Sequence, residues 1–125
     1  MVQQVLILGG SGRIGSSVAA DLLAHTQADV IIAGRNLSLG DQVCRRLGER
    51  SQFLSLDLNH PADLDNAIAS VDLVIHCAGP FHYRDTRVLQ RCIRHRVNYV
   101  DVSDHPSFTR KVMDLATEAE AAGVT

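Results

Sequence analysis

The sequence has no apolar run long enough to cross a membrane and no recognisable leader. A membrane helix needs about 20 consecutive apolar residues, and polar residues interrupt this chain well before that length. The apolar start, residues 5–8, has no basic segment before it and runs straight into glycines, which does not fit a signal peptide. We therefore expect a cytoplasmic protein with no membrane association.

Metal-binding patterns are also missing. The three cysteines leave an odd count and have no metal spacing. We expect them to be reduced, with Cys77 and Cys92 in the core. No two of the six histidines have the His-x-x-x-His spacing of a helical metal site. The sequence therefore predicts no metal centre.

An excess of basic charge is missing as well. The formal net charge is −2 at neutral pH, Lys111 is the only lysine, and no aromatic pattern suited to base stacking is present. Nucleic acid is therefore excluded as an expected partner. With 125 residues, 46% of them hydrophobic and 21% charged, the chain has the composition of one globular α/β domain rather than of a disordered segment.

Short apolar runs alternate with stretches of helical periodicity along the whole chain. Unbroken apolar runs are typical of parallel strands covered on both faces. We predict strands at residues 5–8, 30–33, 53–56, 72–78 and 98–102. The helices between and after them are predicted from the apolar stripes Ile14, Val18 and Leu22; Leu39, Val43 and Leu47; Leu64, Ala67 and Ile68; Val88, Leu89, Cys92 and Ile93; and Phe108, Val112, Leu115 and Ala119.

This alternation predicts a doubly wound parallel α/β sheet of Rossmann type with strand order 3-2-1-4-5. The last helix begins near Pro106, with Asp104 as its candidate cap, and ends before Gly123. The six-stranded form of this fold needs one further strand. We therefore expect residues 1–125 to be a dinucleotide-binding domain that forms the N-terminal part of a longer protein, with an open fifth strand able to pair with another copy or a partner.

The strongest site signal is the sequence Gly-Gly-Ser-Gly-Arg-Ile-Gly at residues 9–15. It contains G-x-G-x-x-G at Gly10, Gly12 and Gly15. We expect Gly10 to permit a tight turn, Gly12 to let a diphosphate approach the backbone, and Gly15 to let the helix pack closely. Alone the pattern is weak, but the strand before it and the amphipathic helix after it favour a phosphate-binding loop over a plain glycine turn.

The second predicted strand ends without the carboxylate that commonly binds the ribose 2′-hydroxyl of NAD. The residues there are Gly34, Arg35 and Asn36. The Arg35 guanidinium suits a 2′-phosphate, and Arg13 in the glycine loop can close on the same group. NADP(H) is therefore favoured, with NAD(H) and a merely solvated Arg35 as the alternatives.

Taken together, these features resemble the NADP-binding N-terminal domain of the saccharopine dehydrogenase-like family. The resemblance lies in residues 5–15, 33–35, 72–81 and 98–103 and covers nearly the whole chain. The Ala-Gly-Pro-Phe turn and the Tyr-Val-Asp-Val-Ser strand are its more specific parts, since many families share the glycine loop.

The resemblance implies a role for each loop that follows a strand. The expected contacts are the diphosphate with Gly10, Ser11, Gly12, Arg13 and Ile14; the adenosine phosphate with Arg35 and Asn36; the adenine with Asp57 and Leu58; the nicotinamide side with Ala78, Gly79, Pro80 and Phe81; and the reacting end with Asp101 and Ser103. A plain turn at Gly79-Pro80 and a capping role for Asp101 are the alternatives. The family's substrate residues come largely from a second domain, which this chain lacks.

Two functions stay open at this point. The chain has no Tyr-x-x-x-Lys pair of the short-chain dehydrogenases, because Arg87 and Ser103 stand four residues after Tyr83 and Tyr99. The leading hypothesis is the cofactor half of an NADP-dependent oxidoreductase, inactive without its substrate domain. The alternative is a non-catalytic dinucleotide-binding module, such as a redox sensor or a regulatory subunit.

Arginines recur at helical spacing in the fourth predicted helix. Arg84, Arg87, Arg91 and Arg94 are expected on one helix face. That face is either solvated or turned toward an acidic partner or the absent domain.

Overall fold

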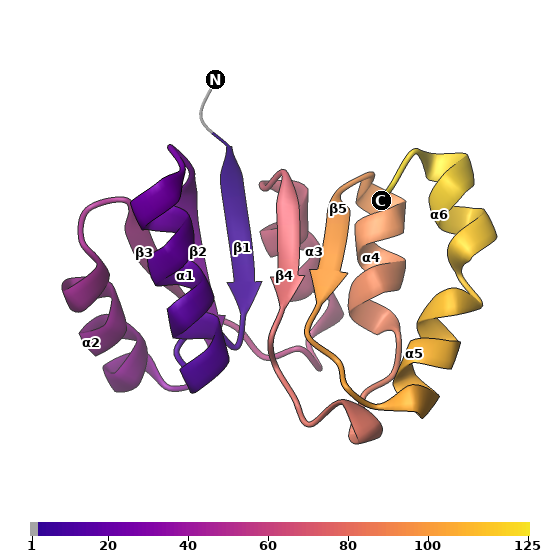
Figure 1. Cartoon of the computed structure of the whole chain (residues 1–125), viewed down its shortest axis with the longest axis horizontal. Helices are drawn as coiled ribbons and strands as arrows, with labels where there is room; N and C mark the ends of the chain where they lie inside the picture. The colour runs from indigo at the N-terminus through magenta and orange to yellow at the C-terminus, as the bar shows by residue number, and fades with distance from the viewer. Residues whose placement is uncertain (1–2) are drawn as a thin grey trace.

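Five parallel strands lie side by side in the order β3-β2-β1-β4-β5 in the computed structural model, which describes residues 3–125 (Figure 1). The strands are β1 (Gln4–Leu8), β2 (Asp29–Gly34), β3 (Ser51–Ser55), β4 (Leu73–His76) and β5 (Asn98–Asp101). The predicted fold class and strand order are confirmed.

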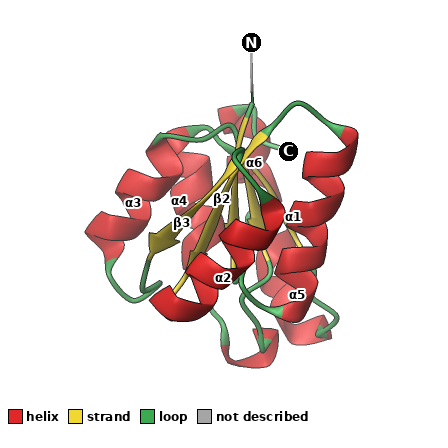
Figure 2. Cartoon of the chain, turned by 90° about the vertical axis from the view of Figure 1, so that its left-hand side faces the viewer, coloured by secondary structure: helices red, strands yellow, loops and turns green. Residues whose placement is uncertain are grey.

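Helices cover both faces of the sheet, with α3 and α4 on one side and α1 on the other (Figure 2). Their bounds are α1 (Arg13–His25), α2 (Leu37–Leu47), α3 (Pro61–Ala69), α4 (Arg87–His95), α5 (Pro106–Met113) and α6 (Ala116–Ala122), with a short 3₁₀ helix η1 (Phe81–Tyr83) before α4. Within residues 3–125, no helix combines the length and the hydropathy that a bilayer span requires.

Strand β1 explains why the apolar runs are unbroken. Successive side chains point to opposite faces of a strand. Leu6 and Leu8 join the cluster that contains Leu64 of α3 and Cys92 of α4. Val5 and Ile7, which share the opposite face of the strand, join the second cluster, with residues of α1 and α2. Both faces of β1 are therefore buried, as its sequence predicts.

All five strands run in the same direction, so the loops after them meet at one edge, the lower edge in Figure 1. Leu8, the last residue of β1, pairs with Ala33 of β2 and with His76 of β4. His76 in turn pairs with Asp101 at the end of β5. This edge is where open α/β sheets bind ligands, at the point where the strand order reverses.

The C-terminal residues return to the edge of β5. The Thr125 carbonyl accepts a hydrogen bond from the Tyr99 N–H at 2.9 Å, and the Thr125 N–H donates to Asn98 Oδ1 at 3.1 Å. Val124 is buried beside them. The amino end of the β5 edge is therefore covered, while the rest of this edge has no strand beside it among the described residues.

The last predicted helix differs from expectation in two ways. It is two helices, because the backbone tightens between Asp114 and Leu115, where the Leu115 N–H donates to the Val112 carbonyl three residues back. The predicted cap Asp104 is also wrong. His105 occupies the cap position; its side chain bonds Ser107 Oγ of α5 at 2.8 Å rather than a backbone N–H, and the His105 N–H donates to Ser103 Oγ at 3.2 Å.

Several predicted core positions are not fully buried, among them Ile14, Leu39, Cys77, Ile93, Val112, Leu115 and Ala119. Ile14 is 54% exposed and Leu39 is 41% exposed. Each stands in the first turn of a helix that begins at the carboxyl edge, where the sheet has already ended and offers nothing to pack against. Of the two cysteines expected inside, Cys92 is buried but Cys77, just past the end of β4, is only half-buried.

Candidate functional site

The glycine loop turns through Gly9 and Gly10, and Gly9 is the one with a positive φ. Gly9 has φ +73°, and a Cβ there would lie 2.8 Å from the Cys77 carbonyl oxygen. Gly10 has no positive φ; a Cβ there would lie 2.8 Å from Cγ2 of Ile32. Gly10 lies within the turn, as predicted, and its lack of a side chain also permits close packing on β2. The N–H groups of both glycines donate to the Ala33 carbonyl, at 2.9 and 3.3 Å.

The other two glycines have opposite surroundings. A Cβ on Gly15 would lie 2.3 Å from the Gly9 carbonyl oxygen, so α1 can approach the loop only with glycine there. A Cβ on Gly12 would have the Gly9 carbonyl oxygen, at 3.3 Å, as its one neighbour within 4 Å and would otherwise face open space. Gly12 precedes α1 without a side-chain cap, so the N–H groups of the first helical turn have no acceptor from the cap side chain. This arrangement fits a phosphate group.

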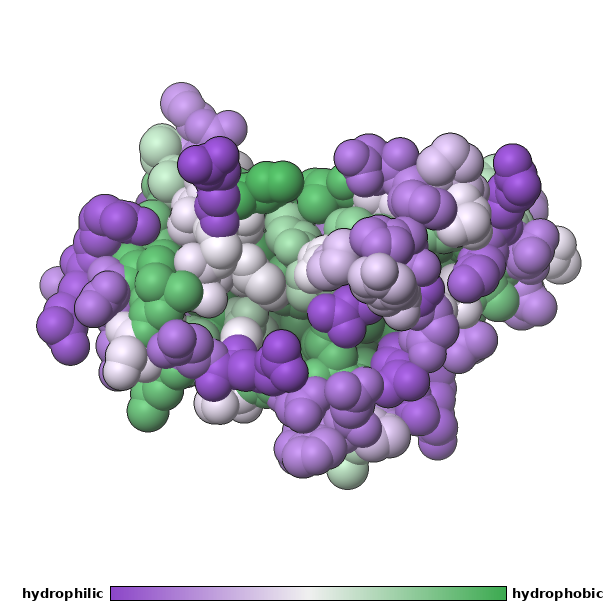
Figure 3. All heavy atoms as spheres, turned by 90° about the horizontal axis from the view of Figure 1, so that it is seen from below, coloured by the Kyte–Doolittle hydropathy of each residue, from purple (hydrophilic) through white to green (hydrophobic). Residues whose placement is uncertain are grey.

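A cleft of about 430 Å³ opens beside this loop at the carboxyl edge. Seen from below in Figure 3, apolar and neutral surface lies between hydrophilic patches at this edge. Eight of the predicted site residues line the cleft: Ser11, Gly12, Arg35, Asn36, Asp57, Leu58, Ala78 and Gly79. The other eight do not: Gly10, Arg13, Ile14, Gly15, Pro80, Phe81, Asp101 and Ser103.

At the β2 end of the cleft, Arg35 is exposed and Asn36 caps α2 by accepting a hydrogen bond from the Leu39 N–H at 3.0 Å. Asp57 follows β3 and accepts from the Asn59 N–H at 2.9 Å. That bond, together with the charges of His60, Arg35 and Arg84, lowers the pKa of Asp57. Asp57 is therefore an ionised carboxylate on which the guanidinium groups of both Arg35, after β2, and Arg84, after η1, act.

At the β4 end, Phe81 turns inward. It is buried and packs against Phe108 of α5, with ring centroids 5.0 Å apart. The ring of His76 lies 5.0 Å from the Phe81 ring on another side. Phe81 therefore anchors the Gly79-Pro80 turn in the core, and the cleft wall here consists of Cys77, Ala78 and Gly79.

At the β5 end, Asp101 organises its own loop. Its carboxylate accepts from the Tyr99 hydroxyl at 2.7 Å and from the Ser103 N–H at 3.0 Å. Burial, and then the bond to Asp101, raises the pKa of Tyr99 well above its ordinary value. Asp101 and Ser103 are therefore fixed at the carboxyl edge but outside the cleft.

Sequence reasoning missed Arg84 as a lining residue. Arg84 does not lie on α4; it follows η1, and its Nε donates to the Ala78 carbonyl at 2.8 Å. Its spacing to Arg87 suggested a helix, but α4 begins only at Arg87. The Pro80 turn and η1 are the reason, because together they carry Arg84 back toward the cleft.

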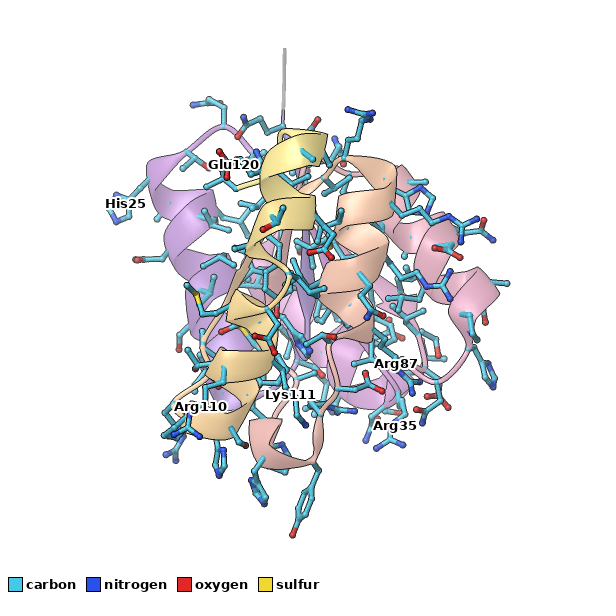
Figure 4. The ribbon with its side chains drawn as sticks, turned by 90° about the vertical axis from the view of Figure 1, so that its right-hand side faces the viewer. His25, Arg35, Arg87, Arg110, Lys111 and Glu120 are labelled. Carbon is cyan, nitrogen blue, oxygen red and sulfur yellow. The ribbon has the colours of Figure 1, made fainter. Side chains whose placement is uncertain are left out.

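The helix-face arginines are also less solvated than the sequence suggested. Arg87 donates to Asp85 at 2.9 Å and to Asn59 Oδ1 at 3.1 Å, which ties α4 to the loop after β3. Arg91 pairs with Asp65 of α3 at 2.9 Å. Arg35 and Arg87 both lie toward the lower edge in Figure 4.

No cluster of three or more His, Cys, Asp or Glu side chains suited to a metal ion occurs in residues 3–125.

Residues 5–125 match the sequence profile of the saccharopine dehydrogenase NADP binding domain. The chain belongs to this family. The matched range includes the glycine loop and every residue that lines the cleft.

Relatives of this domain are much longer proteins. Saccharopine dehydrogenase-like oxidoreductase of Rattus norvegicus is 26% identical over 121 residues, which cover 84% of this chain and 28% of the relative. The Bos taurus protein of the same name is 31% identical over 120 residues, which cover 83% of this chain and 28% of the relative. The chain thus spans less than a third of the length of these relatives.

Solved structures agree with this assignment. Apo saccharopine dehydrogenase (L-Glu forming) of Saccharomyces cerevisiae superposes with a TM-score of 0.80 at 28% identity. The superposed region covers 98% of this chain and 26% of that protein. A short-chain dehydrogenase/reductase of Veillonella parvula in complex with NADP has a TM-score of 0.68 at 22% identity, with 82% of this chain and 48% of that protein covered. The second likeness concerns the fold alone.

Proposed function

We propose that this domain binds NADP(H) in preference to NAD(H) and is the cofactor half of an oxidoreductase. The observation that carries the proposal is the pairing of Gly12 with Arg35 in one cleft. Gly12 leaves open space at the start of α1, and Arg35 stands at the end of β2, where residues 34–36 contain no carboxylate. A diphosphate and a 2′-phosphate are the groups that suit these two positions.

Asp57 does not contradict this assignment. It lines the same cleft, but it follows β3 and already accepts the Asn59 N–H. Arg35 and Arg84 together exceed its charge by one positive unit. The cleft therefore stays favourable for an anion, and the carboxylate is suited to a neutral donor such as a ribose hydroxyl or an amino group.

The chemistry of the reaction comes from the cofactor, which transfers a hydride through its nicotinamide when bound. The residues of this chain bind and orient. The N–H groups at the start of α1 would hold the phosphates, Arg35 would neutralise the adenosine end, and the wall at Ala78-Gly79 would limit where a ring can lie. The relatives are more than three times as long as the range matched here, which supports a substrate site supplied by a further part of a longer protein.

A non-catalytic dinucleotide-binding module is the second candidate. It is favoured by the near absence of candidate acid–base groups in the cleft, where Asp57 and the half-buried Cys77 are the titratable groups besides the arginines. Burial raises the pKa of Cys77, which therefore stays a thiol. The full-length protein distinguishes the two candidates: NADPH oxidation with an added carbonyl or imine substrate supports the enzyme, and binding without turnover supports the module.

The proposed cofactor preference is tested by titrating NADPH and NADH into the native chain and into Arg35→Ala and Arg35→Asp variants. Charge-assisted hydrogen bonds contribute roughly 1.5–3 kcal/mol, so the native chain should prefer NADPH by about tenfold to hundredfold. Arg35→Ala should remove most of this preference with little change for NADH. Arg35→Asp should invert it, because the carboxylate repels the phosphate and accepts from the hydroxyl.

Arg45→Ala is the matched control, since Arg45 is an exposed arginine in the last turn of α2, at the far end from the cleft. It should leave both affinities unchanged. Equal native affinities for the two cofactors, or a preference that survives Arg35→Ala, would show that Arg35 is a solvated loop residue.

A further inference from the structure

We propose that Arg84 is the cation for the cofactor's diphosphate, on the cleft wall opposite the glycine loop. The inference rests on the proposed function and deepens it. Arg35 would then distinguish NADPH from NADH, whereas Arg84 would raise the affinity for both. The two arginines of the cleft lining would have separate tasks.

Arg84 lines the same cleft as the glycine loop but comes from a different part of the fold. The glycine loop leads into α1 on one face of the sheet, while α3 and α4 pack together on the other. Arg84 stands three residues before the start of α4 and lines the cleft together with Ser11 and Gly12. A diphosphate lying on the start of α1 therefore has the Arg84 side of the cleft across from it.

The guanidinium of Arg84 has hydrogen-bond donors left for a ligand. Arg84 uses Nε to donate to Ala78 O, and this is its one side-chain hydrogen bond to the described part of the chain. Its two terminal nitrogens are left to donate elsewhere. Arg87, its near neighbour, is occupied by Asp85 and Asn59 instead. A half-buried guanidinium held at one nitrogen presents its other donors with little loss of side-chain entropy on binding.

The diphosphate of the cofactor needs a positive charge near it. The diphosphate of either cofactor carries two negative charges, and the start of α1 offers backbone dipoles but no charged side chain that lines the cleft. Arg13, the basic residue of the loop, is exposed and does not line it. Arg35 follows β2 beside Asn36, whereas Arg84 is held at the Ala78 carbonyl after β4. Arg84 is thus the guanidinium placed for the phosphates that NADPH and NADH share.

The test compares NADPH and NADH affinities of the native 125-residue chain with those of Arg84→Gln and Arg84→Lys, at low and at raised salt. Arg84→Gln should weaken both cofactors by the same factor, roughly tenfold, with the preference for NADPH unchanged. The salt dependence of both affinities should become shallower, because one screened charge pair is lost. Arg84→Lys should restore part of the affinity, since it keeps the charge.

Arg94→Gln is the control, because Arg94 is an exposed arginine of α4 that does not line the cleft. It should bind both cofactors as the native chain does. Circular dichroism and melting temperatures establish that each variant is folded.

The possible results distinguish the role of Arg84 from the proposed cofactor binding. If Gln and Lys weaken binding equally and salt has no effect, Arg84 only holds the Ala78 wall, because both variants lose the bond from Nε. If Arg84→Gln reduces NADPH binding alone, Arg84 belongs to the 2′-phosphate site. Either result overturns this inference, as does unchanged affinity, while the proposed function stands. A native chain that binds neither cofactor overturns the proposed function itself.

Discussion

His76 is a buried histidine at the end of β4, directly behind the cleft. It is 1% exposed, and its Nδ1 accepts the Ala78 N–H at 3.3 Å, so the ring proton is on Nε2. Nε2 has no hydrogen-bond partner among the described residues. Burial, reinforced by the charge of Arg84 and opposed by that of Asp101, lowers the pKa of His76 to about 4. The ring is therefore neutral at physiological pH.

This shift predicts a pH-dependent stability. The pKa of His76 is 6.5 in a model compound and about 4 in the fold, so the unfolded chain binds more protons between these values. Stability from this group is complete above about pH 6.5 and falls as the pH drops toward 4, by up to about 3 kcal/mol. His76→Asn should remove that dependence, because the amide does not titrate.

Urea unfolding of the native chain and of His76→Asn at pH 7.5, 5.5 and 4.5 measures the difference. Carboxylates whose pKa is lowered, such as Asp65 and Asp85, also lose stability in acid, but they do so in both proteins and cancel. Parallel pH curves for the two proteins would mean that His76 is not the titrating group.

Gly12 gives a second prediction at this scale. Its backbone is extended, with φ −79° and ψ −179°, and its Cβ position has one close neighbour at 3.3 Å. Gly12→Val is therefore compatible with folding, but the branched side chain enters the space that the diphosphate needs. We expect the loss of NADPH binding in calorimetry with little change in melting temperature. Unchanged affinity in the folded variant would remove Gly12 from the site.

At the scale of elements, Arg50 joins α1 to β3 at the edge of the sheet opposite the cleft. Its guanidinium donates to the carbonyls of Leu23, Thr26 and Ala28, the last two at 3.1 and 2.8 Å. These carbonyls lie at or just after the C-terminal end of α1, where cations are favoured. Arg50 therefore supplies hydrogen-bond donors at the C-terminal end of α1, whereas Gly12 precedes its N-terminal end.

Arg50→Ala should lower the free energy of unfolding by about 1–3 kcal/mol, since three carbonyls, two of them in part-buried bonds, lose a charged donor. Denaturant unfolding provides the measurement, and Arg46→Ala, an exposed arginine of α2, is the control. Cofactor affinity should not change, because Arg50 does not line the cleft. A variant as stable as the control would mean that water replaces these bonds without cost.

The same scale explains which parts of the site the sequence could predict. Elements with their own periodicity, such as β1 and α1, were predictable, because burial on a sheet imposes that pattern on the sequence. The route of the chain between β4 and α4 was not. There the Pro80 turn and η1 place Phe81 in the core and Arg84 in the cleft. Those placements depend on contacts with α5 and with Ala78 that no local spacing encodes.

At the scale of the whole molecule, the two edges of the sheet differ. β3 and β5 are the outer strands, and the end of the chain covers only the start of the β5 edge, through Tyr99 and Thr125. Val100 of β5 is 49% exposed, and Val102 just after it is 37% exposed. Exposed apolar residues along an unpaired strand edge favour pairing with another chain.

We therefore expect the isolated chain to self-associate through β5. Light scattering across a concentration series should detect a dimer or larger species, and Val100→Lys should shift it to monomer, because a charge on an edge strand opposes strand pairing. Gln52→Lys places the same charge on the exposed outer strand β3 and should associate as the native chain does. A native chain that stays monomeric at high concentration contradicts the prediction. Loss of association in both lysine variants would instead assign it to net charge, and loss in Gln52→Lys alone would place the contact on β3.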